Sequence, residues 1–465
     1  MNSLAIYNSF GKKRENFRPQ KNNISMYVCG PTVYGPSHLG HARTYIAFDF
    51  IRKSLEFLGY KVTYVNNITD IHDDIIKESL KLKKPFKKLS EVFSKAYFND
   101  TKKLKIKPAN KYPRVTSNIK EIIKLIQKLI DSGFAYRKDG SVYFSIRKFK
   151  DYGKLSNIKA EETKTGTRIS TDVYSKENIS DFVLWKGAKT NEPSWPSPFG
   201  DGRPGWHIEC SAMSIKYLGI PIDIHGGGQD LLFPHHENEI AQSEAANPKK
   251  TFVKVWMHTG PLTINGQKMS KSLGNFITIP EILKKFSPEE IRYFILSTHY
   301  RSPIDFTEKS VNSSRQSLSR IHEFLDKLNL VKKNKESVSN DLILQAVEKM
   351  EASYKKGLLD DFNSPKMLAA VFETINILQP KLFYISKKQA ALIFRSISKL
   401  DYAFNFLIPR RKKIPPSINT LLRLRELKRK KKDWEASDKL RKKLLFLGWS
   451  VEDTQLGPYL KKIER

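Results

Sequence analysis

The chain has 465 residues, of which 39% are hydrophobic, and a formal net charge of +34. Its two cysteines, Cys29 and Cys210, exclude a disulfide framework, and no apolar run approaches the ~20 residues that cross a bilayer. The charge predicts a polyanionic partner, chiefly nucleic acid, although a general over-use of lysine explains it equally well. Because the N-terminus lacks the pattern of a secretory signal, a cytoplasmic, reducing compartment is expected.

Three elements follow one another near the N-terminus. Residues 24–29 form an apolar run that predicts a strand, which ends at the turn signal Gly30-Pro31. Residues 38–58 carry apolar side chains at a broadly helical spacing. Residues 61–66 predict the next strand. A strand, a helix and a strand in this order are typical of a βαβ unit in a parallel sheet.

The middle of the chain continues this α/β pattern around an insertion. An amphipathic helix is predicted at residues 120–132 and a short strand at 142–146. Residues 154–191 are polar and rich in Thr, Ser and Lys, which indicates an irregular insertion that elaborates the sheet domain. Strands at 222–224 and 253–257 predict a second α/β stretch.

The last third of the sequence has a different pattern. It is almost purely helical from about residue 310 to about residue 407. Residues 409–416, PRRKKIPP, form a basic linker rich in proline. The tail from Ser417 is interpreted as a small separate module, and its residues 420–447 are dominated by Lys, Arg and Leu.

The first motif that indicates chemistry is His38-Leu-Gly-His41, placed where the first strand's loop enters a helix. Backbone N–H groups at a helix N-terminus favour anions, and two imidazoles beside them can donate to phosphate oxygens. Gly40 lets a flat ligand approach the backbone closely. On its own the motif is weak, because a single histidine is more often structural.

The second motif is Lys268-Met-Ser-Lys-Ser272, which lies between Gly266 and Gly274. Two lysines three residues apart suit a triphosphate whose charge must be held while bonds rearrange, and such electrostatic stabilisation dominates phosphoryl and nucleotidyl transfer. Considered alone, a solvated basic loop explains Lys268 and Lys271 about equally well.

In combination and in this order, the two motifs resemble the paired signature of the class I aminoacyl-tRNA synthetases, and more narrowly of the cysteinyl-tRNA synthetases. The similarity covers nearly the whole chain. The segments that carry the narrower resemblance are Tyr27–Tyr34, Asn67–Ile71, Gly205–Met213, His225–Glu239, Asp361–Pro365 and Lys432–Thr454. One departure is His72-Asp73-Asp74, where the family usually carries Asp-Asp-Lys.

A metal site is the third candidate, with the ligands Cys29, Cys210, His235 and Glu239. Two sulfurs, an imidazole and a carboxylate suit tetrahedral zinc, and a spacing of four puts His235 and Glu239 on one face of a helix. The resemblance implies zinc at this site, because the four positions match the family's zinc ligands one by one. The run from His235 to Glu239 also suggests a zinc-protease motif, but Ile240 stands where its second histidine would be, which leaves a protease as a remote alternative.

Zinc in this family has a selective role rather than a hydrolytic one. A thiol bound to zinc loses its proton, and serine or alanine cannot form the same bond, so discrimination is large without editing. A purely structural zinc is the alternative.

The resemblance also implies a substrate pocket. Trp206 forms a wall of the small side-chain pocket, and Gly30 and Thr69 meet the amino or carboxylate end of the substrate cysteine. The ATP-binding residues are expected to be His38, His41 and Lys271 together with Gly226, Gly227 and Asp230. In this interpretation Gly226 to Gly228 form a turn that admits the adenosine, with Asp230 on the ribose.

The expected fold is α/β: a Rossmann-like parallel-sheet catalytic core with an insertion, followed by an α-helical bundle and a small C-terminal module. The catalytic domain covers residues 1–309, with an inserted connective subdomain at about 110–200 and a KMSKS-bearing stem-contact region at about 255–309. The helical bundle covers residues 310–408. The anticodon-binding module covers residues 417–465.

The implied reaction is that of a cysteine–tRNA ligase. The carboxylate of L-cysteine attacks the α-phosphorus of Mg²⁺–ATP, and the terminal adenosine of tRNA-Cys then attacks the adenylate. The catalytic residues are expected to be His38, His41, Lys268 and Lys271. The protein is expected to carry one Zn²⁺, to act as a monomer and to have no membrane partner. Trp434 could stack on an anticodon base, but a core or inter-helix tryptophan explains this residue at least as well, so Trp434 is not counted among the site residues.

Three rival functions remain open at this stage. An enzyme that joins activated cysteine to a small-molecule amine would share the motifs but lack the anticodon module. A degenerate synthetase used as an RNA-binding protein would have lost signature residues. A membrane-surface protein is disfavoured because the basic residues interrupt helices with no apolar face opposite.

Overall fold

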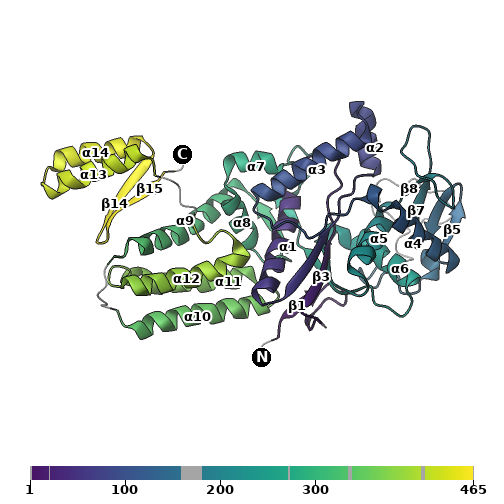
Figure 1. The fold of residues 1–465 in the computed structure, drawn as a ribbon, viewed down its shortest axis with the longest axis horizontal. Helices are drawn as coiled ribbons and strands as arrows, with labels where there is room; N and C mark the ends of the chain where they lie inside the picture. The colour runs from purple at the N-terminus through teal and green to yellow at the C-terminus, as the bar shows by residue number, and fades with distance from the viewer. Residues whose placement is uncertain are drawn as a thin grey trace. The chain divides into compact units, whose positions relative to one another are not determined.

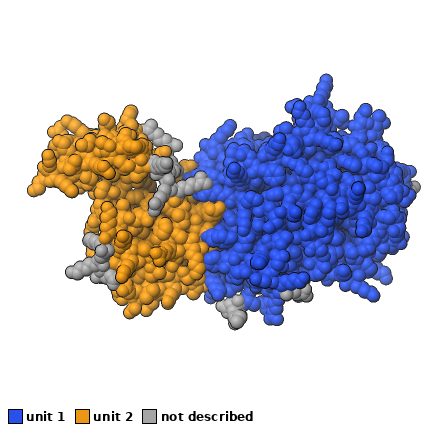
Figure 2. Space-filling view, in the orientation of Figure 1, with its two compact units in different colours: residues 1–314, 355–367, 402–404 blue, residues 315–354, 368–401, 405–465 orange. Residues whose placement is uncertain are grey.

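The computed structural model describes residues 3–19, 21–158, 181–270, 273–332, 338–409 and 414–463. The chain divides into two compact units, shown in different colours in Figure 2. Unit 1 comprises residues 1–314, 355–367 and 402–404. Unit 2 comprises residues 315–354, 368–401 and 405–465. Within the described residues, no helix combines the length and apolarity that a membrane crossing requires.

The core of unit 1 is a four-stranded parallel sheet. Its strands, in spatial order, are β10 (Val253–Thr259), β9 (Ile222–Gly228), β3 (Asn23–Val28) and β4 (Lys61–Asn66). The strands predicted from sequence are confirmed, although β9 runs four residues beyond its predicted end. A short antiparallel hairpin, β1 (Ala5–Asn8) and β2 (Lys13–Asn16), precedes the sheet.

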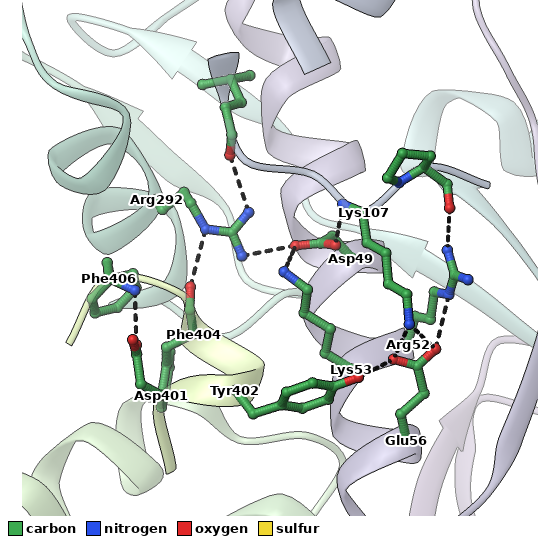
Figure 3. Close-up of polar contacts among 12 residues, drawn as sticks. Asp49, Arg52, Lys53, Glu56, Lys107, Arg292, Asp401, Tyr402, Phe404 and Phe406 are labelled. Carbon is green, nitrogen blue, oxygen red and sulfur yellow. Dashed lines mark hydrogen bonds and ion pairs between the residues drawn. The ribbon is translucent and has the colours of Figure 1, made fainter. Parts of the chain in front are cut away.

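Helix α1 (Leu39–Phe57) is the crossover between β3 and β4, and most of its side chains are buried. Its Asp49 carboxylate accepts from Lys53 Nζ at 3.0 Å and from Arg292 Nη2 at 2.8 Å, and both partners are buried (Figure 3). The Arg292 guanidinium also donates to the carbonyl oxygens of Leu104 and Phe404. This network fixes α1, whose first turn carries the first motif, to the later part of unit 1.

Two helices follow β4: α2 (Asp73–Leu82) and α3 (Phe86–Lys103). His72 is the N-cap of α2, and its Nδ1 accepts from the backbone N–H of Asp74 at 3.2 Å. The residue that departs from the family pattern therefore begins a helix.

The insertion forms a second sheet covered by a helix. The amphipathic helix α4 (Ile119–Asp131) is followed by four antiparallel strands in sequential order, β5 (Ala135–Lys138), β6 (Ser141–Phe144), β7 (Phe182–Gly187) and β8 (Gly202–Pro204). Residues 159–180 of the predicted irregular stretch lie outside the described residues. The prediction of irregular structure for residues 154–191 is wrong at β7, because Phe182 to Trp185, near the end of this stretch, form a buried apolar strand.

Two helices connect the insertion to the parallel sheet. Helix α5 (Trp206–Leu218) leads into β9, and α6 (Glu237–Ala246) leads from β9 toward β10. Between β9 and α6 lie a 3₁₀ turn, Gln229–Leu231, and a π-type turn, Leu232–His236. Helices α4, α5 and α6 share one hydrophobic core with the second sheet.

The segment after β10 carries the lysine motif. Strand β11 (Leu262–Ile264) pairs antiparallel with β12 (Gln267–Lys268) and parallel with β13 (Ile304–Phe306). Helices α7 (Ile279–Lys285) and α8 (Pro288–Leu296) lie between β12 and β13 in the sequence. Each begins with a capping box, at Thr278 and at Ser287.

The remaining elements confirm a helical region and a small C-terminal module. The helices are α9 (Glu308–Leu330), α10 (Asn340–Leu359), α11 (Ser364–Leu378) and α12 (Lys387–Phe404) (Figure 1). The module consists of α13 (Pro416–Lys430), α14 (Trp434–Phe446), β14 (Trp449–Thr454) and β15 (Gly457–Lys462). Its own small core includes Ile418, Leu444, Trp449 and Val451. Unit 2 contains both the predicted module and most of the predicted bundle.

Candidate active site and metal centre

The site is built at the carboxyl edge of the parallel sheet, where open α/β folds bind their ligands. Cys29 directly follows β3, and Thr69 lies three residues beyond β4. Gly226 to Gly228 end β9, the next strand of the sheet. The sheet topology therefore brings residues from distant parts of the sequence to one edge.

The four predicted metal ligands come together in this place. One donor atom from each of Cys29, Cys210, His235 and Glu239 lies within 4.8 Å of all the others, and all four side chains are buried. Cys210 lies in the second turn of α5, His235 in the turn before α6, and Glu239 in the first turn of α6.

The distances between these donors fit a tetrahedral metal. With Zn–S bonds of about 2.3 Å and Zn–N or Zn–O bonds of about 2.0 Å, a tetrahedron has S···S edges near 3.8 Å, S···O edges near 3.5 Å and N···O edges near 3.3 Å. The two Sγ atoms are 3.9 Å apart, Cys29 Sγ is 3.6 Å from Glu239 Oε1, and His235 Nε2 is 3.1 Å from the same oxygen. The cluster can therefore hold a metal ion.

Burial sets the electrostatics of this cluster. It raises the pKa of the Glu239 carboxyl and of the Cys29 thiol well above their usual ranges, because a dry interior disfavours both anions. Glu239 Oε2 is buried and has no hydrogen-bond partner among the described residues. A divalent cation would supply both the missing partner and the charge that lets these groups deprotonate.

Two further imidazoles reach the same cluster and were not predicted as ligands. His236 Nε2 lies 3.3 Å and His225 Nε2 lies 3.6 Å from Cys29 Sγ, so these histidines form a second possible donor set with Cys29 and Glu239. Both belong to the segment 225–239 that carried the family resemblance. Their spacing of eleven residues has no metal-binding pattern, so only the fold reveals their convergence.

Another histidine orients a ligand from outside the cluster. His207 Nδ1 lies 3.0 Å from His235 Nδ1, an arrangement that directs the opposite ring nitrogen, Nε2, toward Glu239. Outer contacts of this kind fix the tautomer and direction of a metal-binding imidazole. Gln242 in turn donates to the backbone carbonyl of His207, which connects α6 to α5 beneath the site.

The predicted substrate residues are held by contacts close to the cluster. Trp206 stacks on His235, with ring centroids 4.4 Å apart. A Cβ at Gly30 would lie 1.6 Å from the carbonyl oxygen of Asn67, so only glycine fits there. The buried Thr69 donates to Glu209 Oε2 at 3.2 Å. Glu209, which is buried and was not predicted, adds an acidic group to the pocket, and burial raises its pKa.

The two signature histidines occupy the N-terminus of α1. His38 is the N-cap, and its ring stacks on that of His41 with centroids 3.7 Å apart. Burial and the neighbouring His38 lower the pKa of His41 well below its usual value, so its imidazole is neutral and carries one N–H donor. A Cβ at Gly40 would lie 3.0 Å from the His38 ring, so glycine lets this ring pack closely on the helix.

The lysine loop lies beside this helix start. The backbone N–H of Leu39 donates to Ile277 O at 3.0 Å, and that of Ile279 donates to Ser37 O at 2.9 Å. The Met269 side chain approaches Gly40, because its Cε would lie 3.5 Å from a Cβ at that position. Lys268, at the end of β12, is exposed, and Lys271 lies outside the described residues.

The three glycines predicted to admit the adenosine end a strand instead of forming a turn. A Cβ at Gly226 would meet the Phe48 ring of α1 at 2.2 Å, so this glycine lets the helix pack closely on β9. Gly227 is buried and faces His236, whereas Asp230 is exposed in the 3₁₀ turn that follows. Contact of Gly226, Gly227 and Asp230 with a nucleotide therefore stays a prediction.

Comparisons with known proteins agree with the site. A family described as the class I (C) tRNA synthetase catalytic domain matches residues 16–316, and the cysteinyl-tRNA ligase anticodon binding domain matches residues 411–459. The chain is 45% identical to the cysteine–tRNA ligase of Thermococcus gammatolerans over 99% of this chain and 100% of the relative. It is 46% identical to that of Methanococcus vannielii over 97% of both chains.

A solved structure supports the fold assignment independently. The methionyl-tRNA synthetase of Mycobacterium tuberculosis in complex with methionyl-adenylate superimposes with a TM-score of 0.62. The match covers 82% of this chain and 90% of that one at 15% identity. At this identity the likeness shows the shared fold alone.

Proposed function

Because the chain belongs to the family of the cysteine–tRNA ligases, we propose that it activates L-cysteine with ATP and esterifies it to the 3′ adenosine of tRNA-Cys. The observation that carries the proposal is the buried set of two sulfurs, an imidazole and a carboxylate at tetrahedral distances, with Trp206 packed on His235.

The metal ligands in this proposal are Cys29, Cys210, His235 and Glu239, with zinc as the ion. When bound, zinc supplies a ligand position that a cysteine thiolate fills and that serine or alanine cannot fill equally well. The choice of this set over the one with His225 and His236 is supported by His207, which directs His235 toward Glu239. It is also supported by Trp206, which packs on His235 and closes that side.

The pocket residues have distinct roles in holding the amino acid. Trp206 bounds the side-chain pocket, and the hydroxyl of Thr69, oriented by Glu209, faces the amino or carboxylate end. Gly30 is fixed by a hydrogen bond from its backbone N–H to Asn67 Oδ1 at 2.7 Å, which holds its backbone close against Asn67. Such positioning turns an attack on ATP into an intramolecular event.

Phosphate chemistry is assigned to the residues around the start of α1. His38 and His41 donate to the α-phosphate of Mg²⁺–ATP as the cysteine carboxylate attacks, and the helix N-terminus adds its own N–H groups. Lys268 and Lys271 hold the departing pyrophosphate. Gly226, Gly227 and Asp230 are proposed to meet the adenosine and its ribose.

The acceptor is proposed to be tRNA rather than a small amine. The module at 416–462, in the region that matches an anticodon-binding domain, supports this choice. Trp434 is 56% exposed, so it is no core tryptophan, and the Arg429 guanidinium lies 5.6 Å from its ring centroid. An exposed ring beside a cation is suited to stacking on an unpaired base. Cytoplasmic location and a monomeric state remain predictions.

The test is transfer of labelled cysteine to total tRNA with ATP, before and after removal of zinc with a chelator. We expect cysteine to charge one tRNA, charging to fail without zinc and to return with it, and serine to be inactive. Cys210→Ser should lose zinc and charging, whereas Ser214→Ala, a buried change one turn further along α5, should keep both. Failure of the intact, zinc-loaded protein to charge any tRNA would overturn the proposal.

A further inference from the structure

The helical hairpin formed by α2 and α3 stands out from the rest of unit 1. Residues 83–85 connect the two helices at its tip (Figure 1), and in Figure 2 the hairpin forms the projection at the top of the blue unit. Leu80 and Leu82, beside the tip, are 61% and 42% exposed. Ile76 and Phe86 of the hairpin pack on the neighbouring hydrophobic core, whereas the exposed side chains at the tip take no part in it, so the composition of the exposed side chains indicates what they meet in solution.

The tip is strongly basic. Residues 77–95 contain seven lysines and two glutamates. Four of these lysines, Lys83, Lys84, Lys87 and Lys88, fall within six residues at the tip, and all four are exposed. None of their ammonium groups has an ion-pair partner in the described part of the chain, in contrast to Lys107, which pairs with Glu56 at 2.8 Å. The positive charge of the tip is therefore uncompensated.

The base of the hairpin is fixed to the active site. At the start of α2, the His72 ring packs edge-on against Trp206 with centroids 5.8 Å apart. On the returning helix, the Tyr97 hydroxyl donates to Asn66 Oδ1 at 2.6 Å, and Asn66 ends strand β4. The ten residues of α2 rise about 15 Å at 1.5 Å per residue, so the tip is held roughly that far from the substrate pocket.

We propose that this tip, defined as Lys83, Lys84, Lys87 and Lys88, contacts phosphates of the tRNA near its 3′ end while the terminal adenosine occupies the active site. The inference rests on the proposed function. A distance of about 15 Å corresponds to roughly four nucleotide steps of 3.4 Å along a stacked strand. Lysines act there as point charges on the backbone, so they add affinity without reading sequence.

RNA fits the tip better than a lipid surface does. A membrane-binding helix presents a continuous apolar face, but Ile75 and Ile76 of α2 are buried in the protein. The large apolar side chains that are exposed on the described hairpin are Leu80, Leu82 and Val92, which are separated by lysines and form no continuous face. The proximity of the pocket, where an RNA 3′ end must arrive, favours the same choice.

The test compares two quadruple variants of the full-length protein with equal loss of charge. The tip variant is Lys83→Gln, Lys84→Gln, Lys87→Gln and Lys88→Gln. The control variant replaces four exposed lysines at the amino edge of the parallel sheet, opposite the site: Lys21→Gln, Lys61→Gln, Lys249→Gln and Lys250→Gln. None of the control lysines has an ion-pair partner among the described residues.

We expect the tip variant to raise the KM for tRNA about 10-fold or more at 0.15 M salt, with kcat within twofold of the unmodified protein. In direct binding of tRNA, the slope of log K against log salt should become shallower by up to ~3.6, since each of the four phosphate contacts contributes about 0.7–0.9. The control variant should change KM less than threefold. ATP–pyrophosphate exchange with cysteine needs no tRNA and should stay unchanged in both.

Two results would overturn the inference. One is equal weakening of tRNA binding by the tip and control variants, which would make the charge a diffuse property of the whole surface. The other is an unchanged tRNA affinity in the tip variant combined with loss of binding to vesicles of phosphatidylserine and phosphatidylcholine at 1:3, which would assign the tip to lipid. Absence of exchange and charging in the unmodified protein would count against the proposed function instead, because direct binding is measured without catalysis.

Discussion

Replacement of Gly30 by alanine gives the sharpest test of the pocket. The added Cβ would lie 1.6 Å from the carbonyl oxygen of Asn67 and 2.6 Å from its carbonyl carbon. Because non-bonded carbon and oxygen atoms stay more than about 3 Å apart, one of the two backbones must move by more than 1 Å. That movement would strain the 2.7 Å hydrogen bond from Gly30 N to Asn67 Oδ1 and displace Thr69, which Asn67 contacts at 3.1 Å.

The expected effect is large and specific to the amino acid. A misplacement of about 1 Å in a positioned site costs around 100-fold in rate, so kcat/KM for cysteine should fall at least that much, or about 2.7 kcal/mol. The assay is cysteine-dependent ATP–pyrophosphate exchange, with thermal unfolding followed in parallel. Gly59→Ala is the matched control, because its φ of +94° strains alanine but its Cβ meets no atom within 4 Å. A kcat/KM within threefold of the unmodified protein would refute the reasoning.

Two further predictions concern stability. Asp49→Asn leaves the buried Lys53 and Arg292 cations without their anion, so the free energy of unfolding, measured in urea, should fall by about 3–5 kcal/mol. The control is Glu91→Gln, which removes an exposed ion pair with Arg114 and should change the same free energy by less than about 1 kcal/mol. Equal effects of the two changes would contradict the role given to the Asp49 network. Burial raises the pKa of Asp100 to about 6, above the roughly 3.9 of an unfolded chain. The unfolded state therefore loses this proton at a lower pH than the folded state does. The Asp100 carboxyl consequently lowers the free energy of unfolding progressively as pH rises from about 4 to 6. Asp100→Asn should stabilise the protein by about 1–2 kcal/mol at pH 8 and leave it unchanged at pH 3.5, and a benefit independent of pH in urea unfolding would exclude this origin.

Local patterns were sufficient for much of the fold. The strand, helix and strand predicted at 24–29, 38–58 and 61–66 occur within one residue of those limits, because short-range periodicity and turn residues govern each of them. The buried strand Phe182–Gly187 was missed, since its apolar run follows a long polar stretch that dominates the composition of the region. The sequence also does not reveal the length of β9, because three consecutive glycines are typical of a turn, and only the structure shows Phe48 packed against the first of them, Gly226.

The sequence by itself determined the family, the two phosphate motifs and the four candidate ligands, because each rests on residue types in a fixed order. Only the tertiary structure decided that His225, His236 and His207 converge on the same cluster, and that Glu209 meets Thr69. The same holds for the pairing of Asp49 with Arg292 across 243 positions. The contacts at the cluster depend on how β9, α5 and α6 meet at one edge of a parallel sheet, and the Asp49–Arg292 pair depends on how α1 packs on α8. The spacing of residues along the chain does not predict these contacts, since burial and proximity arise only when the layers of the fold assemble.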